Sequence, residues 1–409
     1  MNKLSHISSP FSVNHNQCLC VGDVSVTQLA NRVGATPFFA YDRKIICDRI
    51  NYLRRLMPQD LKIHYSMKAN PMPAVVQQMA YLADGLDVAS GDELRCALDT
   101  VIQKQNISFA GPGKTDTELT CAVASEVIIH VESAHELQRL EQIGMALGIT
   151  PKVSIRVNPD FELRSSGMKM SGGAKPFGID AECVPNILRN IATKQFDFHG
   201  FQIFCGSQNL QSEAIIEAQS KIFDLALRLS DAAAISPRLL NIGGGFGIPY
   251  FPGDQALNIQ RIGHYLHEMM PRIKKALPTM SIAIESGRYL VGEAGIYVSK
   301  IIDKKISRGK IFLVVDGGMH HHLAASGNLG QVIRKNYPVL IGNKIFSPET
   351  EVVSIVGCSC TPLDILADQV VLSRAEIGDL VVVLQSGAYG LTASPVNFLS
   401  HKRALEVLV

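Results

Sequence analysis

Apolar residues occur in short runs along most of the chain, and between these runs they recur at helical spacing. Eight runs are typical of buried strands, at residues 61–67, 85–89, 107–110, 127–131, 152–157, 200–204, 239–242 and 281–285. Helices are predicted between them, at residues 72–82, 134–147, 181–191, 213–229 and 259–277. This alternation predicts an α/β fold, a closed parallel (β/α)8 TIM barrel. A doubly wound open sheet is the main alternative.

After Arg288 the pattern changes to strands without long helices, at residues 296–302, 311–315, 351–356 and 380–384. We interpret this part as a C-terminal β-domain, completed by the N-terminal segment with its predicted strand at 37–41. The expected domains are residues 1–41, a segment that joins the β-domain; residues 42–290, the barrel; and residues 291–409, the β-domain.

Composition favours an enzyme acting on small molecules. The 409 residues suit a barrel of about 250 residues plus a second domain. Basic and acidic residues are nearly balanced, at 39 and 37, so no basic surface for nucleic acid is predicted. We find neither a signal-peptide pattern nor a membrane-spanning run. Nine scattered cysteines fit free thiols in a reducing compartment, so we expect a cytoplasmic protein.

Chemically useful residues follow several predicted strands. Lys68 closes the first strand, where burial at a barrel mouth lowers a lysine pKa and makes a Schiff-base nucleophile. The loops after strands six to eight carry a set suited to one phosphate: Ser207, the glycines Gly243, Gly244 and Gly245, and Arg288. A surface lysine and a tight glycine turn are the alternatives for these motifs taken singly.

A phosphate site combined with a Schiff-base lysine indicates pyridoxal 5'-phosphate. This cofactor needs an acid beside its pyridine nitrogen, and Glu285 closes the eighth strand. A structural glutamate is the alternative for this residue.

From about residue 38 onward, the combined motifs resemble the fold-type III pyridoxal-phosphate decarboxylases, which include diaminopimelate, ornithine and arginine decarboxylases. The resemblance implies that Lys68 carries the Schiff base and that Glu285 pairs with the pyridine nitrogen. It implies that Arg288 and Tyr389 bind the phosphate.

The same resemblance assigns further residues. Cys360 matches the catalytic cysteine that the family donates across a homodimer interface, so shared active sites are expected. Asp87 and Arg156 match supporting positions near the cofactor.

Three departures from the family pattern bear on the substrate. Phe204 stands where relatives stack a histidine on the cofactor, and Thr361 stands where an acid binds the distal amine of ornithine or diaminopimelate. The Arg-x-x-x-Tyr pattern for a far carboxylate is absent from residues 320–330. The chain therefore looks more like the carrier-linked branch, which includes glutamyl-acyl-carrier-protein and exosortase-associated decarboxylases.

The resemblance implies α-decarboxylation of an L-amino acid or of an acidic, acylated or carrier-linked conjugate, with Cys360 returning a proton to Cα. The alternative with the same reaction but other substrates is decarboxylation of diaminopimelate, ornithine or lysine. Racemisation is the alternative reaction, and a non-catalytic regulator is the alternative that is not an enzyme.

Other motifs are given structural interpretations. Residues 110–115 suggest a nucleotide loop but lack the glycine that a P-loop requires. His320, His321 and His322 are adjacent, so they face different directions, and we predict packing at the cofactor edge or solvation instead of a metal site. Cys358 is predicted to be a packed thiol, although a redox or metal role is open to it.

Overall fold

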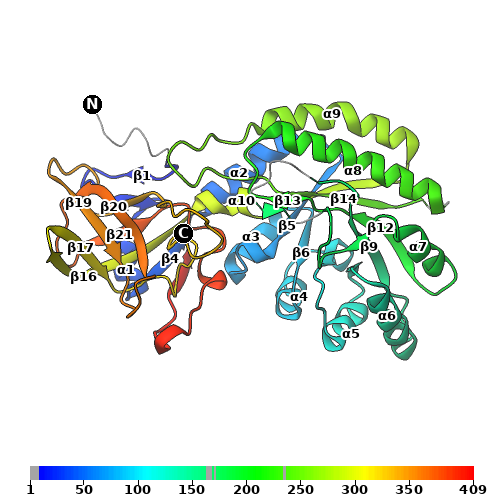
Figure 1. The fold of residues 1–409 in the computed structure, drawn as a ribbon, viewed down its shortest axis with the longest axis horizontal. Helices are drawn as coiled ribbons and strands as arrows, with labels where there is room; N and C mark the ends of the chain where they lie inside the picture. Colours follow the sequence, from blue (N-terminus) through cyan, green and yellow to red (C-terminus); the bar gives the residue numbers. More distant parts are fainter. Residues whose placement is uncertain (1–8, 163–167, 170–171, 234–235) are drawn as a thin grey trace. The chain divides into compact units, whose positions relative to one another are not determined.

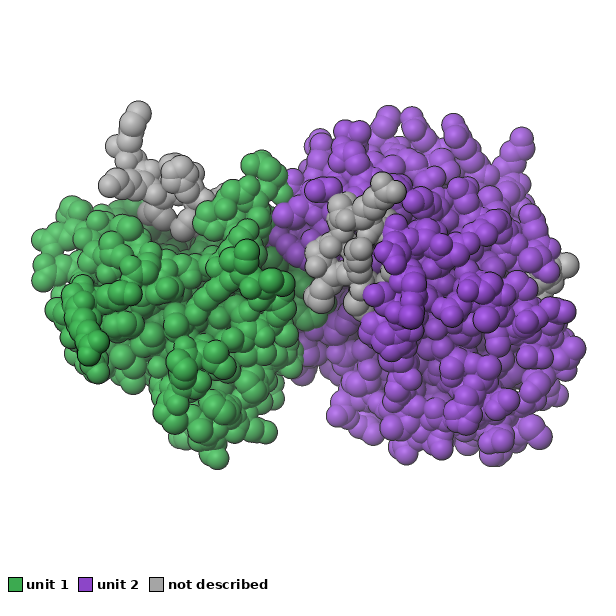
Figure 2. Space-filling model, viewed as in Figure 1, with its two compact units in different colours: residues 1–49, 249–255, 288–409 green, residues 50–248, 256–287 purple. Residues whose placement is uncertain are grey.

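The computed structural model describes residues 9–162, 168–169, 172–233 and 236–409. The chain forms two compact units (Figure 2). The barrel unit comprises Ile50–Ile248 and Ala256–Gly287, and the β-rich unit comprises Met1–Arg49, Pro249–Gln255 and Arg288–Val409. Within the described residues, no helix is long and apolar enough to cross a membrane.

The barrel unit contains eight parallel strands: β5 (Leu61–Ser66), β6 (Gly85–Val88), β7 (Ile107–Phe109), β8 (Ile128–Val131), β9 (Lys152–Asn158), β12 (Asp197–Gln202), β14 (Leu239–Gly244) and β15 (Ser281–Ser286). Each pairs with the next, and β15 pairs with β5, which closes the ring. The predicted (β/α)8 barrel is therefore confirmed, and the open-sheet alternative is wrong.

Helices follow most of these strands (Figure 1): α3 (Pro73–Leu82), α4 (Gly91–Leu98), α5 (Asp116–Ala124), α6 (Ala134–Leu147), α7 (Val184–Ala192), α8 (Ser212–Ala233) and α9 (Ile259–Ala276). Three begin at hydroxyl side chains, Ser90, Thr115 and Ser133, which accept a hydrogen bond from an early amide of the helix. The caps at Ser90 and Ser133 start their helices two residues after a strand end, and Thr115 starts α5 six residues after β7, so the strand-end residues stay at one mouth of the barrel.

The β-rich unit is built on an antiparallel core around the long strand β16 (Gly295–Ser307). Its main sheet has the order β18-β21-β16-β17-β19-β20 (β18 Val339–Ile341, β21 Leu380–Val383, β17 Lys310–Val315, β19 Thr350–Val356, β20 Ile365–Ser373). β4 (Phe38–Tyr41) pairs with β16 on one side and with β22 (Leu405–Leu408) on the other. The N-terminal segment thus joins the sheet of this unit.

A hydrophobic cluster fills the β-rich unit beneath α1 (Val26–Val33). Phe38, Val298 and Val382 belong to it, and each is fully buried. A small sheet of β1 (Ser12–Val13), β2 (Leu19–Val21) and β3 (Val24–Ser25) adds Leu19 and Val21 to the same cluster.

The unit boundaries differ slightly from the expected domain limits at residues 41/42 and 290/291. The start of α2 (Arg43–Leu56) belongs to the β-rich unit, where Arg49 forms an ion pair with Glu293. Pro249–Gln255 also belongs there, and the Pro249 carbonyl accepts a hydrogen bond from Gln385 Nε2 at 3.2 Å. A short irregular segment such as Pro249–Gln255 has no hydrophobic period, so the sequence pattern does not show that it belongs to the β-rich unit.

Candidate active site

Lys68 lies in the short 3-10 helix η1 (Met67–Ala69), directly after β5. Met67 and Ala69 are buried, whereas Lys68 is exposed. Its Nζ lies 5.6 Å from the ring centroid of Phe204. The buried setting expected for this lysine is therefore wrong for the isolated chain: its two neighbours anchor the backbone, and its own side chain points out of the core.

Two carboxyl groups and a histidine lie together at the barrel mouth. Asp87 on β6, His130 on β8 and Glu285 on β15 are all buried, and one polar atom from each lies within 4.8 Å of the other two. Glu285 Oε1 accepts hydrogen bonds from Gln202 Nε2 at 2.5 Å and Asn241 Nδ2 at 2.6 Å. Amide donors therefore fix the Glu285 carboxylate from two neighbouring strands.

The electrostatics of this cluster follow from burial. Burial and then the nearby Glu285 raise the pKa of Asp87 well above its ordinary value, while Lys68 opposes that shift. Burial and the cations Lys114 and Arg156 lower the pKa of His130 well below its ordinary value. Burial thus favours the uncharged forms of both the Asp87 carboxyl group and the His130 imidazole.

The glycine loop at the end of β14 approaches its neighbours too closely for side chains. A Cβ on Gly244 would lie 1.7 Å from the Glu285 carbonyl oxygen, and one on Gly245 would lie 2.2 Å from that of Gly206. Gly243 and Gly245 also have positive φ angles, 67° and 80°. Ser207, in β13 (Gly206–Ser207), is half-buried. The structure brings the glycine loop close to Gly206, the neighbour of Ser207, so two of the predicted phosphate loops meet; Ser207 itself lies in a short strand, not in the predicted loop.

Arg288 begins α10 (Arg288–Val291) in the β-rich unit. Its guanidinium carbon lies 4.4 Å from the ring centroid of Tyr389 and 5.4 Å from that of Tyr250. Arg288 Nη1 donates a hydrogen bond to the Tyr250 hydroxyl at 2.6 Å. Tyr389 holds a positive φ of 54°, a strained conformation typical of functional positions. Two tyrosines thus orient the arginine, and the sequence indicated only Tyr389.

Cys360 is exposed on the loop from Gly357 to Asp364 that follows β19. Asp364 is buried, and its two carboxylate oxygens accept hydrogen bonds from the amides of Met319, at 2.6 Å, and Ser359, at 3.0 Å. A Cβ on Gly357 would lie 2.2 Å from that carboxylate. Hydrogen bonds to the buried Asp364 carboxylate therefore stabilise the loop, and Cys360 is exposed to solvent on it.

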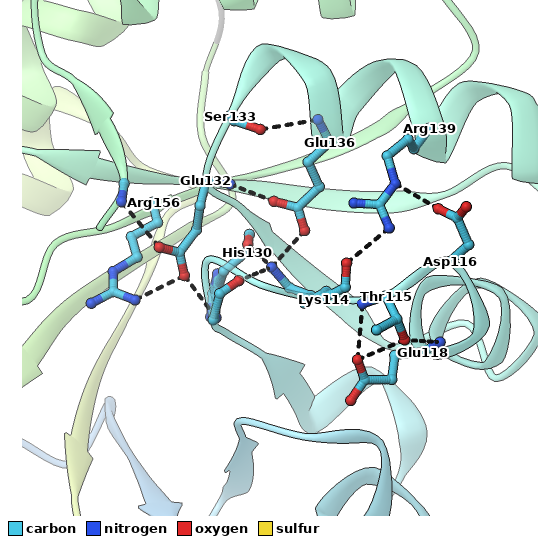
Figure 3. A network of polar contacts seen from close by, with 12 residues as sticks. Lys114, Thr115, Asp116, Glu118, His130, Glu132, Ser133, Glu136, Arg139 and Arg156 are labelled. Atoms are coloured by element: carbon cyan, nitrogen blue, oxygen red, sulfur yellow. Dashed lines mark hydrogen bonds and ion pairs between the residues drawn. The ribbon is translucent and has the colours of Figure 1, made fainter. Parts of the chain in front are cut away.

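Lys114 belongs to the rejected nucleotide motif, and its environment is structural (Figure 3). Its side chain is 1% exposed and its Nζ pairs with Glu136 Oε1 at 2.6 Å. The same ammonium donates to the carbonyls of Gly111 at 2.7 Å and His130 at 3.0 Å. Because lysine has three N–H donors, these three acceptors use all of them.

Arg156 on β9 joins the adjoining network (Figure 3). Its Nη1 donates to Glu132 Oε1 at 2.8 Å, and its guanidinium carbon lies 5.1 Å from the ring centroid of Phe177. The Glu132 amide donates to Glu136 Oε2 at 2.8 Å, which connects this pair to the Lys114 pair. Arg156 therefore has a structural partner in the chain. Sequence reasoning missed Glu132 and Glu136, which come from outside any motif.

Comparisons with known proteins agree with this geometry. Residues 43–292 match the family described as "Pyridoxal-dependent decarboxylase, pyridoxal binding domain". The chain belongs to the pyridoxal-dependent decarboxylases. It is 37% identical to L-glutamyl-[BtrI acyl-carrier protein] decarboxylase of Niallia circulans over 94% of this chain and 90% of the relative.

Two further relatives extend the comparison. This decarboxylase is 32% identical to the diaminopimelate decarboxylase of Aquifex aeolicus, over 96% of this chain and 90% of the relative. The crystal structure of diaminopimelate decarboxylase from M. jannaschii superimposes with a TM-score of 0.88 at 25% identity, covering 97% of this chain and 92% of that one. The protein is therefore an amino acid decarboxylase, and pyridoxal phosphate is its cofactor.

The barrel mouth fits this cofactor on its own evidence. Both ring nitrogens of buried His130 and the buried Gln202 Oε1 have no hydrogen-bond partner among the described residues. In the same cluster, the side-chain amides of Gln202 and Asn241 hold the Glu285 carboxylate at Oε1. Unpartnered buried polar atoms are costly, which favours a polar ligand at this position.

Proposed function

We propose that this decarboxylase acts on an acidic, acylated or carrier-linked L-amino acid, and acts poorly on ornithine, lysine and diaminopimelate. The observation that carries this proposal is the Cys360 loop. Its only acid, Asp364, is buried and uses both carboxylate oxygens for backbone amides. Thr361, beside Cys360, offers a hydroxyl group. A distal ammonium therefore finds no carboxylate on this loop, and an unpaired buried charge costs several kcal/mol.

Two further considerations support the same substrate class. The relative at 37% identity is named for a glutamyl group on an acyl-carrier protein. The sequence also places Arg164, Lys169 and Lys175 in one loop that could meet a carboxylate or a carrier phosphate. Lys175 is exposed, the backbone of Lys169 lies in β10 (Met168–Lys169), and Arg164 lies outside the described residues.

In this proposal several residues named above bind the cofactor. Lys68 provides the amine that binds its aldehyde, and Glu285, fixed by Gln202 and Asn241, keeps its pyridine nitrogen protonated. Ser207, the amides of Gly244 and Gly245, Arg288 and Tyr389 bind its phosphate; Asp87 and Arg156 support the site, and Phe204 lies against the ring face. Once bound, the cofactor accepts the electron pair that remains when carbon dioxide leaves.

Cys360 supplies the proton that replaces carbon dioxide on Cα, as a general acid in the active site of a partner subunit. The exposure of this thiol on a braced loop supports a role outside its own chain. Mixing Lys68→Ala and Cys360→Ala subunits should restore activity through heterodimers with one intact site, while each variant alone stays inactive. Lack of recovery after verified subunit exchange contradicts the shared site.

A substrate panel tests the proposed function. Carbon dioxide release is measured with free glutamate, a glutamyl-carrier protein, ornithine, lysine and diaminopimelate. We expect the acidic or carrier-linked compounds to be preferred, and Thr361→Asp, but not the matched control Thr361→Ser, to improve activity on ornithine and lysine. Wild-type kcat/KM of about 10⁴ M⁻¹s⁻¹ or more on ornithine or diaminopimelate contradicts the proposal.

A further inference from the structure

Three potential metal ligands from distant parts of the sequence meet in the β-rich unit. His320 lies in the turn after β17, and Cys358 follows β19. Because β17 and β19 are parallel neighbours, their carboxyl ends lie at the same edge of the sheet, and the Cys358 amide donates to the Gly317 carbonyl at 3.1 Å. His401 reaches this edge after the short helix η5 (Phe398–Ser400).

The three side chains converge. One ligand atom from each of His320, Cys358 and His401 lies within 4.8 Å of the other two. The Cys358 Sγ and His401 Nε2 are 3.8 Å apart, and the rings of His320 and His401 have centroids 4.7 Å apart. Zinc bonds of about 2.3 Å to sulfur and about 2.0 Å to nitrogen in a tetrahedron imply a sulfur–nitrogen separation of roughly 3.6 Å.

His320 provides an independent reason to expect a ligand. It is fully buried, and its Nε2 has no hydrogen-bond partner among the described residues. Its Nδ1 lies 3.2 Å from the Ser359 hydroxyl oxygen. A second hydrogen-bonded ring nitrogen is how proteins orient a histidine whose other nitrogen binds a metal. Solvation, one of the two expectations for this histidine run, is therefore wrong.

The neighbouring histidines point to other partners. His321 Nε2 is 2.7 Å from the Lys402 carbonyl oxygen, and His322 Nε2 is 2.9 Å from the Ser386 hydroxyl. His322 also packs against the ring of Phe39, as expected for a packed histidine. Of the three histidines, only His320 has a buried ring nitrogen with no hydrogen-bond partner among the described residues. It is also the histidine that lies close to Cys358 and His401.

The donor set suits a metal ion. A neutral imidazole binds a metal ion through a ring nitrogen, and a thiol binds it as the thiolate after losing its proton. The nearby carboxylates of Asp316 and Asp364 each accept hydrogen bonds on both oxygens.

We propose that His320, Cys358 and His401 form a three-ligand site for a divalent ion of the zinc type, with water as the fourth ligand. Binding forms one metal–sulfur and two metal–nitrogen bonds and releases the thiol proton, with no change of oxidation state. The ion would tie the loop that carries Cys360 to the chain segment that leads into β22.

The test uses the purified full-length holoenzyme, freed of metal by a chelator that is then removed. Zn²⁺ is measured by equilibrium dialysis, and Co²⁺ is added as a probe whose tetrahedral visible bands lie at longer wavelengths than cofactor absorption. We expect one ion per chain. Cys358→Ser and His401→Ala should each weaken binding at least about tenfold, and Ser359→Ala about 10- to 100-fold. Absence of binding by the wild-type protein overturns the proposal.

Matched variants separate this site from others. The exposed residues Cys183 and His264 serve as controls, and Cys183→Ser and His264→Ala should bind the ion like wild type. Loss of binding in Cys360→Ser with retention in Cys358→Ser would assign the ion to Cys360 instead and overturn the proposed ligand set. Circular dichroism confirms the fold of each variant, and His401→Gln replaces His401→Ala if the latter does not fold.

Discussion

The loops after β5 and β7 each carry a lysine near a phenylalanine ring, but the two lysines serve opposite purposes. Lys68 Nζ is 5.6 Å from the Phe204 centroid and Lys114 Nζ is 5.8 Å from the Phe109 centroid. Lys68 is exposed, whereas Lys114 is buried with three acceptors around its ammonium. The buried ammonium of Lys114 holds its loop in place, whereas the side chain of Lys68 is exposed and therefore accessible to a ligand. Position after a barrel strand does not distinguish them.

Replacing the exposed lysine should give the largest effect. We expect Lys68→Ala to abolish carbon dioxide release, because no other amine is proposed to bind the cofactor. The free energy of unfolding of the cofactor-free protein should change by less than about 0.5 kcal/mol, as is usual for an exposed side chain. The control is Lys62→Ala, which replaces an exposed lysine on the preceding strand β5 and should remain active. Activity near the wild-type level in Lys68→Ala would contradict the assignment.

Replacing the buried lysine should change stability. Lys114→Met leaves Glu136 buried without its cation, which typically costs about 3–5 kcal/mol in the free energy of unfolding. The double variant Lys114→Met/Glu136→Gln removes the stranded charge and should recover part of that loss. Urea unfolding measures both. A loss below about 1 kcal/mol, or lost turnover in a protein of unchanged stability, would show that Lys114 has a chemical role.

The carboxyl group near Lys68 should make stability depend on pH. Burial raises the folded-state pKa of Asp87 above its unfolded value, so its favourable contribution is fully present below about pH 4 and is lost as pH rises through the folded pKa. In cofactor-free protein, the stability of Asp87→Asn relative to wild type should therefore increase with pH, by at most about 1.4 kcal/mol per unit. Thermal unfolding from pH 4 to 8 measures this, with exposed Asp92→Asn as control. A difference independent of pH contradicts the raised pKa.

Replacing Phe204 should give the smallest effect of these substitutions. Phe204 is half-buried, and stacking on the cofactor contributes about 0.5–1.5 kcal/mol, so Phe204→Ala should weaken cofactor binding roughly 2- to 12-fold. Phe109 is fully buried, and Phe109→Ala should instead cost about 3–5 kcal/mol of stability. Dialysis against cofactor-free buffer followed by absorbance measures the first effect. Unchanged retention in Phe204→Ala indicates that its ring does not contact the cofactor.

Much of the barrel could be predicted because its strands and helices are specified by residues that are close together in the sequence. Apolar runs such as residues 61–66 have a period, and a capped helix follows a strand end within a few residues. The positions of Lys68 and Glu285 at strand ends followed from that periodicity. The helices α4 and α5 were not predicted, because each has only two large aliphatic residues, which are too few to define a helical period.

The environments of side chains could not be predicted in the same way. The exposure of Lys68 depends on the turn of η1, and the burial of Lys114 depends on Glu136, which lies on another helix. His401 meets Cys358 only because the chain returns to β4 through β22. Such contacts join residues that are far apart in sequence, and neither periodicity nor motif spacing records them.

The pairing of β4 between β16 and β22 has a consequence for how the chain is made. A ribosome synthesises Phe38–Tyr41 early, yet one neighbour of this strand follows the whole barrel and the other begins only at Leu405. All four residues of β4 are buried in the finished protein. The nascent chain therefore carries an apolar strand with two open edges throughout synthesis of the barrel, and this segment is where a chaperone would act.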